Sequence, residues 1–268
     1  MRTLEANKIV DWAHYIFVSA KAGLTYASDS CDLKRYAVIK GVAQEMLSLY
    51  TEPHEDLPRR VPNGENKIYL TFDDGPDPVY TPQILDLLKK YGITGTFFLM
   101  GERVRQHPHI VKRIVDEGHA IGNHTYTHPF MILLNEKELN EELSLTDEAI
   151  RDAVGFSPVL FRPPYGLLNQ GTIDLLRARG YEIMMWSEEL EMYDWSFPGV
   201  DNMVRLIEEK TESGSMILLH DGGGTREETV RTLEKVIPLL LERGFHFAAD
   251  YLEQSRNEHG QTAAGTAR

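Results

Sequence analysis

The sequence has a single cysteine, a deficit of basic residues and no long uninterrupted apolar stretch. Cys31 alone cannot form an intrachain bridge, so a disulfide-stapled scaffold is excluded. Lysine and arginine total 28 against 41 acidic residues, and the net charge of −13 opposes binding to nucleic acid or anionic lipid. No apolar run reaches the roughly 18 residues of a membrane-spanning helix, and charges interrupt the N-terminal apolar stretch, unlike a signal peptide. We therefore expect a cytoplasmic protein with no nucleic-acid partner and no membrane association.

The composition that is present is that of an ordinary globular protein. Of the 268 residues, 42% are hydrophobic and 26% are charged, which is typical of a folded domain and excludes a disordered or collagen-like chain. A chain of this length buries about three quarters of its unfolded surface. It therefore needs no covalent staple to hold a core.

Residues 1–60 are predicted to form a helical module and a linker. Apolar residues recur at helical spacing in two segments separated by a polar loop at 23–32, and a proline-rich, charged segment follows at 51–67. A module this short is only marginally stable alone. It therefore either packs on the exterior of the next domain or pairs with a second copy. The two apolar stripes contain Ile9, Trp12, Ile16 and Phe17, and Tyr36, Ile39, Ala43, Met46, Leu47 and Tyr50.

Residues 61–252 alternate short β-rich runs with helical segments. This alternation predicts βαβ units and an α/β fold with a parallel sheet. Seven units over about 190 residues fit a distorted (β/α)7-type barrel better than an open doubly wound sheet, and the first run has no Gly-x-Gly-x-x-Gly after it. The polar residues 253–268 predict a disordered tail. The seven predicted strands are 67–72, 94–100, 119–123, 158–162, 181–186, 215–220 and 245–249.

Residues suited to catalysis follow five of these predicted strands. In a β/α barrel the carboxyl ends of the strands open onto one face, so these side chains are expected to converge. Each has a plainer explanation alone, since Asp-Gly-Pro is a turn sequence and His-x-x-x-His is often a pair of unrelated histidines. Their joint placement favours a single site. The residues are Asp73, Asp74, His124, His128, Arg162, Asp194, Trp195, His220 and Asp221.

Two histidines and one carboxylate form the donor set of a catalytic metal site that leaves positions open for water and substrate. A second carboxylate beside the ligand can take a proton from the attacking water. A histidine from across the mouth can return a proton to a leaving group. The pattern therefore indicates a metal-dependent hydrolase.

The runs TFDDGPDP, HTYTHP, RPPYG, DW and ILLHDGGG, in this order, resemble the five motifs of the polysaccharide deacetylases, carbohydrate esterase family 4. The resemblance covers residues 67 to about 250 and implies the distorted β/α barrel of that family. It implies an enzyme that removes the acetyl group from N-acetylglucosamine-type sugars, in an oligosaccharide or a polysaccharide such as chitin. It also implies a divalent metal cofactor, Zn²⁺ in the first place, with Co²⁺ or Ni²⁺ as alternatives.

The resemblance implies the parts of the metal and base machinery. Asp74, His124 and His128 match the three metal ligands of the family. Asp73 matches the general base, and Arg162 matches the arginine that pairs with this base. These assignments are carried over from the family motifs.

The same resemblance implies the oxyanion, acid and substrate contacts. Tyr165 matches the residue whose backbone N–H helps to bind the oxyanion, and His220 matches the general acid. Asp194 matches the carboxylate that tunes this acid. Trp195 and Leu218 match the apolar wall against the acetyl methyl group.

The fourth motif departs from the family pattern. Asp194 follows the preceding Trp-Ser pair two residues later than the pattern has it, so the intervening loop is longer. Glu189 or Glu191 is therefore an alternative partner for His220, unless both are solvated loop acids.

The N-terminal segment resembles the small helical domain ahead of some Nudix pyrophosphohydrolases acting on nucleoside diphosphates. The resemblance rests on Trp12 and on GLTYASDSCDLKRY at 23–36, where a Gly-Leu-x-Tyr turn precedes Asp-x-x-Arg/Lys-Tyr. The Nudix box is absent, so pyrophosphatase activity is not expected. By this analogy we expect a homodimer formed through residues 1–60, and helices packed on the barrel exterior are the alternative.

Two rival functions use the same residues. One is hydrolysis of a non-sugar C–N bond, of imide or allantoin type, on the same scaffold. The other is a non-catalytic module that only binds sugar. Acetate release from chitooligosaccharides would support a sugar deacetylase over the hydrolase of a non-sugar C–N bond. Failure to take up any divalent metal would favour the non-catalytic module.

Overall fold

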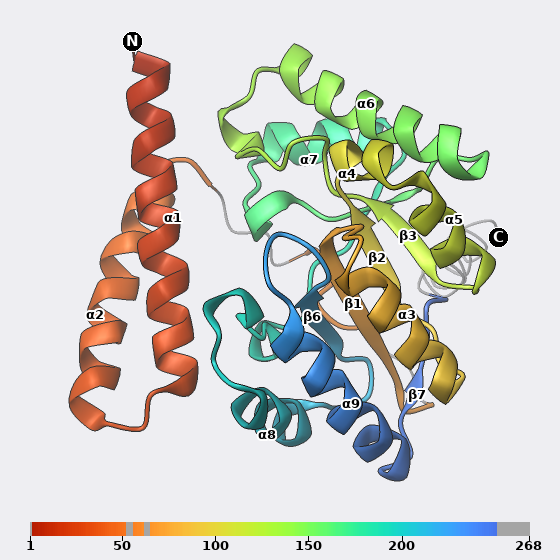
Figure 1. Ribbon diagram of the computed structural model, residues 1–268. Helices are drawn as coiled ribbons and strands as arrows, with labels where there is room; N and C mark the ends of the chain where they lie inside the picture. The colour runs from red at the N-terminus through yellow and green to blue at the C-terminus, as the bar shows by residue number, and fades with distance from the viewer. Residues whose placement is uncertain (1, 52–55, 62–64, 251–268) are drawn as a thin grey trace, which may run out of the picture.

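The computed structural model describes residues 2–51, 56–61 and 65–250, with side chains described from residue 8 onwards (Figure 1). Its core is a seven-stranded sheet with the order β5-β4-β3-β2-β1-β6, and β7 pairs with the start of β1. Every pairing between these strands is parallel. The tail predicted at 253–268 lies outside the described residues, as does part of the predicted linker.

All seven predicted strands are present. Strand β1 (Lys67–Gly75) lies between β2 and β6 and pairs with β6 from Tyr69 to Asp73 and with β2 from Thr71 to Gly75. Between β5 and β6 the structure has an isolated bridge, from Glu191 to Leu218, in place of a ladder. The α/β fold is therefore a distorted, incompletely closed barrel, as predicted. The other strands are β2 (Thr96–Leu99), β3 (Ala120–Asn123), β4 (Leu160–Phe161), β5 (Glu182–Ile183), β6 (Met216–His220) and β7 (His246–Phe247).

The helices of the barrel bury one apolar face each against this sheet. In α9, for example, the buried Val230, Leu233 and Ile237 recur at helical spacing and join the main core with Phe72 of β1. The helices are α3 (Tyr80–Tyr91), α4 (Gly101–Gln106), α5 (Pro108–Asp116), α6 (Glu136–Val154), α7 (Gln170–Ala178), α8 (Val200–Lys210) and α9 (Glu227–Glu242). Short 3₁₀ turns lie at η1 (Met131–Leu133), η2 (Pro164–Gly166), η3 (Glu188–Leu190) and η4 (Asp194–Ser196).

The N-terminal segment is a helical hairpin of α1 (Arg2–Tyr26) and α2 (Ser30–Leu47), as the two apolar stripes predict. The loop is shorter than expected because the Asp29 side chain accepts the backbone N–H groups of Cys31 and Asp32, at 2.9 and 3.1 Å, and so caps α2. Figure 1 shows α1 between α2 and the barrel. Among the described residues, no helix combines the length and apolarity needed to cross a membrane.

The face that α1 buries is made of smaller residues than the predicted stripe. Val10 and Ala13 are buried in a cluster with Leu47 of α2, next to loop residues of the barrel mouth such as Phe130. Small side chains allow this close approach between helices. Most of the predicted stripe faces outward, with exposed fractions of 38% for Ile9, 59% for Trp12 and 42% for Ile16.

Candidate active site

A cleft of about 440 Å³ opens at the carboxyl ends of the strands. Of the ten predicted site residues, eight line this cleft, and the other two, Arg162 and Asp194, lie directly behind Asp73 and His220. The structure therefore brings all ten to one place. The eight lining residues are Asp73, Asp74, His124, His128, Tyr165, Trp195, Leu218 and His220.

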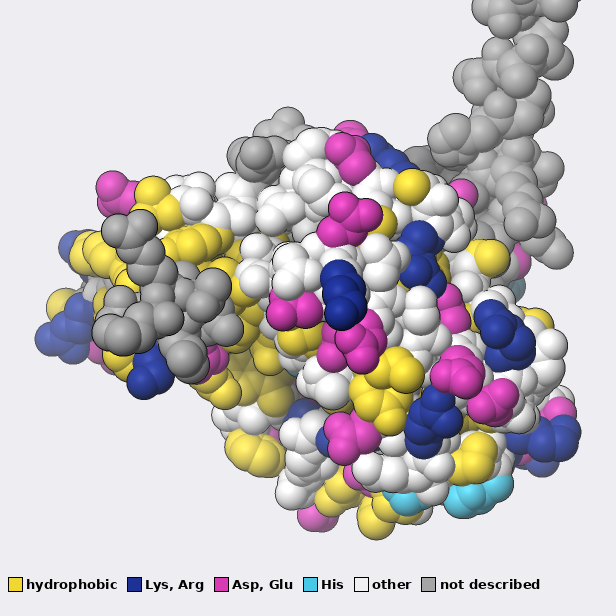
Figure 2. All heavy atoms as spheres, turned by 90° about the horizontal axis from the view of Figure 1, so that it is seen from above, with side chains coloured by type: hydrophobic (Ala, Val, Ile, Leu, Met, Phe, Trp, Pro, Cys, Tyr) yellow, Lys and Arg dark blue, Asp and Glu magenta, His cyan; other side chains and the backbone are white. Residues whose placement is uncertain are grey.

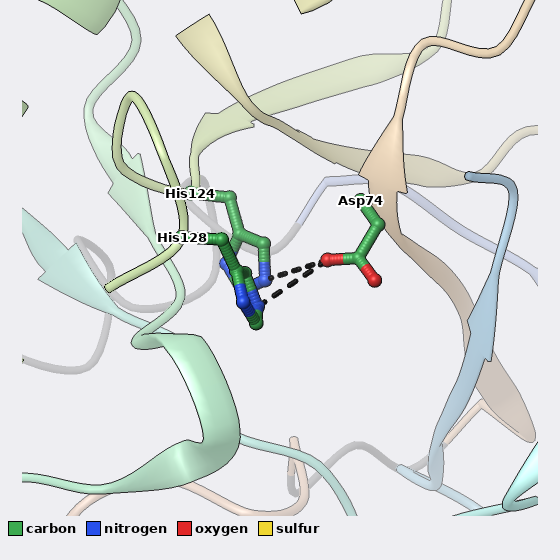
Figure 3. Close-up of side chains that lie close together, drawn as sticks. All are labelled: Asp74, His124 and His128. Carbon is green, nitrogen blue, oxygen red and sulfur yellow. Dashed lines mark ion pairs between the residues drawn. The ribbon is translucent and has the colours of Figure 1, made fainter. Parts of the chain in front are cut away.

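Asp74, His124 and His128 form a cluster suited to a metal ion (Figure 3). Asp74 Oδ1 lies 3.5 Å from His124 Nε2 and 3.3 Å from His128 Nε2, and one ligand atom from each residue lies within 4.8 Å of the others. This carboxylate oxygen is buried and has no hydrogen-bond partner in the described part of the chain. A buried oxygen that faces two imidazole nitrogens in this way fits a divalent cation.

Hydrogen bonds around the cluster orient both imidazoles. His124 Nδ1 lies 2.7 Å from the backbone carbonyl of Arg162, so Nδ1 carries the proton and Nε2 is left free to ligate. Glu142 of α6 accepts two backbone N–H groups of the loop between the histidines, each at 2.8 Å. Burial lowers the pKa of His128 to about 4, which keeps this imidazole neutral, as a ligand must be.

Asp73 stands beside the metal cluster on the same strand and is paired with a buried arginine. Arg162 Nη1 donates to Asp73 Oδ1 at 2.9 Å and to the Thr71 hydroxyl at 2.7 Å. Nε and Nη2 of the guanidinium donate to the backbone carbonyls of Met184 and Met185, at 3.0 and 2.7 Å. The guanidinium is thus held rigidly and presents its charge to Asp73 in a position sealed from solvent.

His220 lines the cleft and is paired with Asp194, which lies behind it. His220 Nδ1 lies 2.6 Å from Asp194 Oδ1, and Asp194 Oδ2 accepts the His220 backbone N–H at 3.0 Å and the Thr229 hydroxyl at 2.7 Å. Burial lowers the pKa of His220, but the adjacent Asp194 carboxylate more than offsets this, so that the pKa rises to about 9. The imidazole is therefore protonated at neutral pH and can donate a proton.

The two alternative acids have other partners. Glu191 pairs with Lys21 of α1 at 2.7 Å, and Glu189 pairs with Arg60. The longer loop forms the two turns η3 and η4. Asp194 is the first residue of η4, and this turn places its side chain next to His220. Of the three acids considered in the sequence, Asp194 is the one in contact with His220.

Tyr165 has a left-handed backbone with φ 61°, which is unusual for a residue with a side chain. Its ring stacks on Phe130 with centroids 4.2 Å apart and meets His128 edge-on at 4.4 Å. Asp74, with φ 70°, and His128, with φ 62°, share this unusual conformation. Such backbone geometry tends to collect at functional sites, because the surrounding structure must hold it in place.

The cleft also contains residues that the sequence did not single out. Trp186 and Arg226 come from the barrel, and Trp186 could have been found because it begins the fourth motif. Residues His14, Tyr15 and Val18 of α1 also line it, and helical periodicity alone gives no sign of this. The candidate Asp221 is buried beneath the cleft, where Thr81 donates a hydrogen bond to it at 2.5 Å.

Comparisons with known proteins agree with this geometry. The family described as polysaccharide deacetylase matches residues 60–184, and the UDP-X-like, N-terminal oligomerisation domain matches residues 7–56. A peptidoglycan-N-acetylglucosamine deacetylase of Bacillus cereus is 40% identical over 196 residues, covering 73% of this chain and 92% of the relative. A chitooligosaccharide deacetylase of a Bradyrhizobium species is 36% identical over 195 residues, covering 68% and 88%. A crystal structure of a peptidoglycan N-acetylglucosamine deacetylase has a TM-score of 0.68 and 37% identity, covering 71% of this chain and 88% of that one.

Proposed function

We infer the mechanism and the substrate from the premise that this chain belongs to the polysaccharide deacetylase family and is a metal-dependent N-deacetylase of N-acetylglucosamine-type sugars. The observation that carries the mechanism is the convergence in one cleft of the Asp74, His124 and His128 cluster with Asp73 and His220. The predicted roles of the site residues are proposed on this basis.

Asp73 accepts a proton from the water that attacks the amide carbonyl carbon, and Arg162 holds its carboxylate in place for this transfer. The backbone N–H of Tyr165 stabilises the oxyanion that forms. When bound by Asp74, His124 and His128, a divalent metal ion supplies Lewis-acid polarisation of the amide carbonyl. His220 donates a proton to the departing nitrogen, the C–N bond breaks, and acetate and a free amino sugar result. The apolar side chains of Trp195 and Leu218 enclose the acetyl methyl group.

We propose Zn²⁺ as the metal, with Co²⁺ and Ni²⁺ as alternatives. Two imidazoles and one carboxylate are a donor set that catalytic zinc sites use. Removing the metal with a chelator, restoring each ion in turn and measuring acetate release tests the assignment. The highest restored rate identifies the metal that supports catalysis, and activity that survives complete removal contradicts the site.

We propose that the substrate is a soluble N-acetylglucosamine oligosaccharide, such as a chitooligosaccharide, or a sugar conjugate. The relatives are named for peptidoglycan N-acetylglucosamine and for chitooligosaccharides, which share the acetylated amino sugar. Acetate release from chitooligosaccharides, peptidoglycan fragments and nucleotide-linked N-acetylglucosamine tests this choice. The cytoplasmic location remains a prediction, and cell fractionation tests it.

We propose that residues 1–60 form a module that mediates homodimerisation and that residues 61–252 form the catalytic domain. The matching family model is described as an oligomerisation domain. Figure 2 shows hydrophobic side chains gathered over the α1–α2 hairpin, on the left of the view. We call this surface the apolar stripe, and exposed large apolar side chains that gather on one surface are typical of an interface. It comprises Ile9, Trp12, Tyr15, Ile16, Val38, Ile39, Val42 and Leu49, all exposed.

A further inference from the structure

Helix α1 supplies part of the wall of the catalytic cleft. His14, Tyr15 and Val18 line the same cavity as Asp73 and His220. The catalytic residues follow residue 60, where the deacetylase match begins, whereas α1 lies in the segment that matches the oligomerisation domain. We propose that α1 is a specificity element of the active site, which limits the enzyme to short oligosaccharides and to terminal N-acetylglucosamine units of longer chains. This inference rests on the proposed function.

Two sets of contacts hold α1 alongside the cleft. Near its middle, the ring of His14 lies edge-on to that of Tyr165, with centroids 4.7 Å apart. Towards its end, Lys21 Nζ lies 2.7 Å from Glu191 Oε2, and the Tyr26 hydroxyl donates to a backbone carbonyl of the same loop at 2.6 Å. The helix between these points is about 18 Å long. It therefore spans from the loop after β4 to the loop after β5.

His14 brings a polar ring to this wall without a protein partner for one of its nitrogens. The side chain is 7% exposed, and its Nδ1 has no hydrogen-bond partner within the described ranges. Burial, and next the electrostatic effect of His128, lower the pKa of His14 to about 4. The ring is therefore neutral and offers one hydrogen-bond donor and one acceptor. Because the His14 side chain also lines the cleft, its ring is placed to exchange a hydrogen bond with a sugar hydroxyl through a nitrogen that faces the cavity.

The size and shape of the cleft set the length of the substrate. Its volume of about 440 Å³ lies in the lower part of the range of small-molecule sites, roughly 300–1,000 Å³. An interior unit of a polysaccharide carries a sugar on each side and needs a groove that is open at both ends. A terminal unit needs one exit only. With Val18 facing the cavity and the exposed Tyr15 at its rim, α1 closes one side, which fits a terminal unit.

The first test locates the acetyl group that the metal-loaded, full-length protein removes. Chitooligosaccharides from the disaccharide to the hexasaccharide are partly deacetylated, and mass spectrometry of fragments identifies the unit that has lost acetate. We expect the terminal unit, with kcat/KM that does not increase from the disaccharide to the hexasaccharide. Deacetylation of interior units as fast as of terminal ones overturns the proposal.

The second test changes the wall. Val18→Trp fills the cleft from α1, and Ser19→Trp is the matched control because Ser19 is exposed and is not among the residues that line the cleft. We expect Val18→Trp to raise KM for the disaccharide by about tenfold or more with little change in kcat, and Ser19→Trp to change neither. Val18→Ala should shift the preference towards the hexasaccharide. Equal KM values and equal length preferences in the two tryptophan variants overturn the proposal.

His14 is tested by a substitution that keeps its ring. His14→Phe preserves the edge-on packing against Tyr165 and removes the two nitrogens. Loss of a hydrogen bond to the sugar should raise KM by about fivefold without lowering kcat. A purely structural role predicts no change in KM, and that result contradicts the contact between His14 and the sugar.

Failure of the proposed function gives a different result from failure of this inference. If no sugar releases acetate with any of the three metals, the proposed function is wrong, and calorimetric titration of the metal-loaded protein with the disaccharide then tests α1. Binding by the wild type and by Ser19→Trp, but not by Val18→Trp, supports α1 as the wall of a sugar site. Equal binding by all three proteins, or no binding by the wild type, overturns it.

Discussion

At the scale of single residues, a substitution of Asp73 tests proton transfer without removing a metal ligand. Asp73→Asn keeps the size of the side chain and an oxygen for the bond from Arg162, but an amide cannot take a proton from water. We expect acetate release to fall by about 10² or more, while the metal content and the melting temperature stay those of the wild type. Turnover close to that of the wild type would show that another group is the base.

The metal cluster predicts a loss of a different kind. His128→Ala removes one of the three predicted ligands, so the protein should lose bound metal together with activity. His109→Ala, which removes an exposed histidine of α5, is the control and should change neither. Metal content is measured by elemental mass spectrometry after dialysis. A full complement of metal in His128→Ala contradicts the assignment.

The pair of His220 and Asp194 predicts a shift in pH dependence. The acid works while His220 is protonated, so activity should be lost as the pH rises through the pKa of this group, about 9. Burial lowers this pKa and the Asp194 carboxylate raises it, so Asp194→Asn should move the alkaline limb of the kcat profile to lower pH. Glu191→Gln is the control, because Glu191 contacts Lys21. A shift in Glu191→Gln and none in Asp194→Asn would transfer this role to Glu191.

The positions of the site residues were predictable because they follow strand ends. Parallel strands open onto one face, so Asp74 and His124 had to come close together once the strands were recognised. The partner of His220 was not predictable, because it depends on how the longer loop turns. Two 3₁₀ turns place Asp194 there and turn Glu191 towards α1 instead.

At the scale of elements, the strands and helices of the barrel were readable and the placement of α1 was not. Periodicity identifies an amphipathic helix but does not say what covers it. The larger residues, such as Trp12, suggested the buried face, whereas the structure buries Val10 and Ala13 against α2. The contact of α1 with the cleft also depends on Glu191, a loop residue that no local pattern connects with the N-terminus.

The ion pair between Lys21 and Glu191 stabilises the docking of α1 on the barrel, and its removal is the next prediction. Glu191 is largely buried and also accepts bonds from the Trp186 indole at 3.3 Å and the Tyr193 hydroxyl at 3.1 Å. Lys21→Met should weaken the docking of α1 by about 1–3 kcal/mol, because a bond to a charged, buried group is lost. We expect faster amide hydrogen exchange in α1 and a higher KM for Lys21→Met than for the wild type.

A double-mutant cycle isolates this contact from the general effects of each substitution. Glu191→Gln removes the charge that Lys21 pairs with, so adding Lys21→Met to it should cost less than Lys21→Met costs in the wild type. Arg35→Met, which breaks an exposed ion pair with Asp32 on α2, is the matched control and should leave exchange in α1 unchanged. Additive effects in the cycle would show that the two side chains do not stabilise docking together.

At the scale of the whole molecule, one helix serves two surfaces. The side of α1 that carries His14 and Val18 faces the cleft, while the rest of the apolar stripe, apart from Tyr15 at the cleft rim, lies outside the residues that line the cleft. Dimerisation through the stripe would bury apolar surface without closing the cavity. It would also hold α1 in place, because a helix that pairs with a second copy is less free to leave the barrel.

The last prediction uses this separation. Val42→Glu places a charge in the apolar stripe on α2, away from the residues that line the cleft, and Gln44→Glu adds the same charge at an exposed position outside the stripe. We expect light scattering at tens of micromolar to give a dimer for the wild type and Gln44→Glu and a monomer for Val42→Glu, because burying an unpaired carboxylate is unfavourable. Acetate release should persist in the monomer. A wild-type monomer at this concentration would contradict the dimer, and a folded, metal-loaded Val42→Glu monomer without activity would show that the second copy contributes to the substrate site.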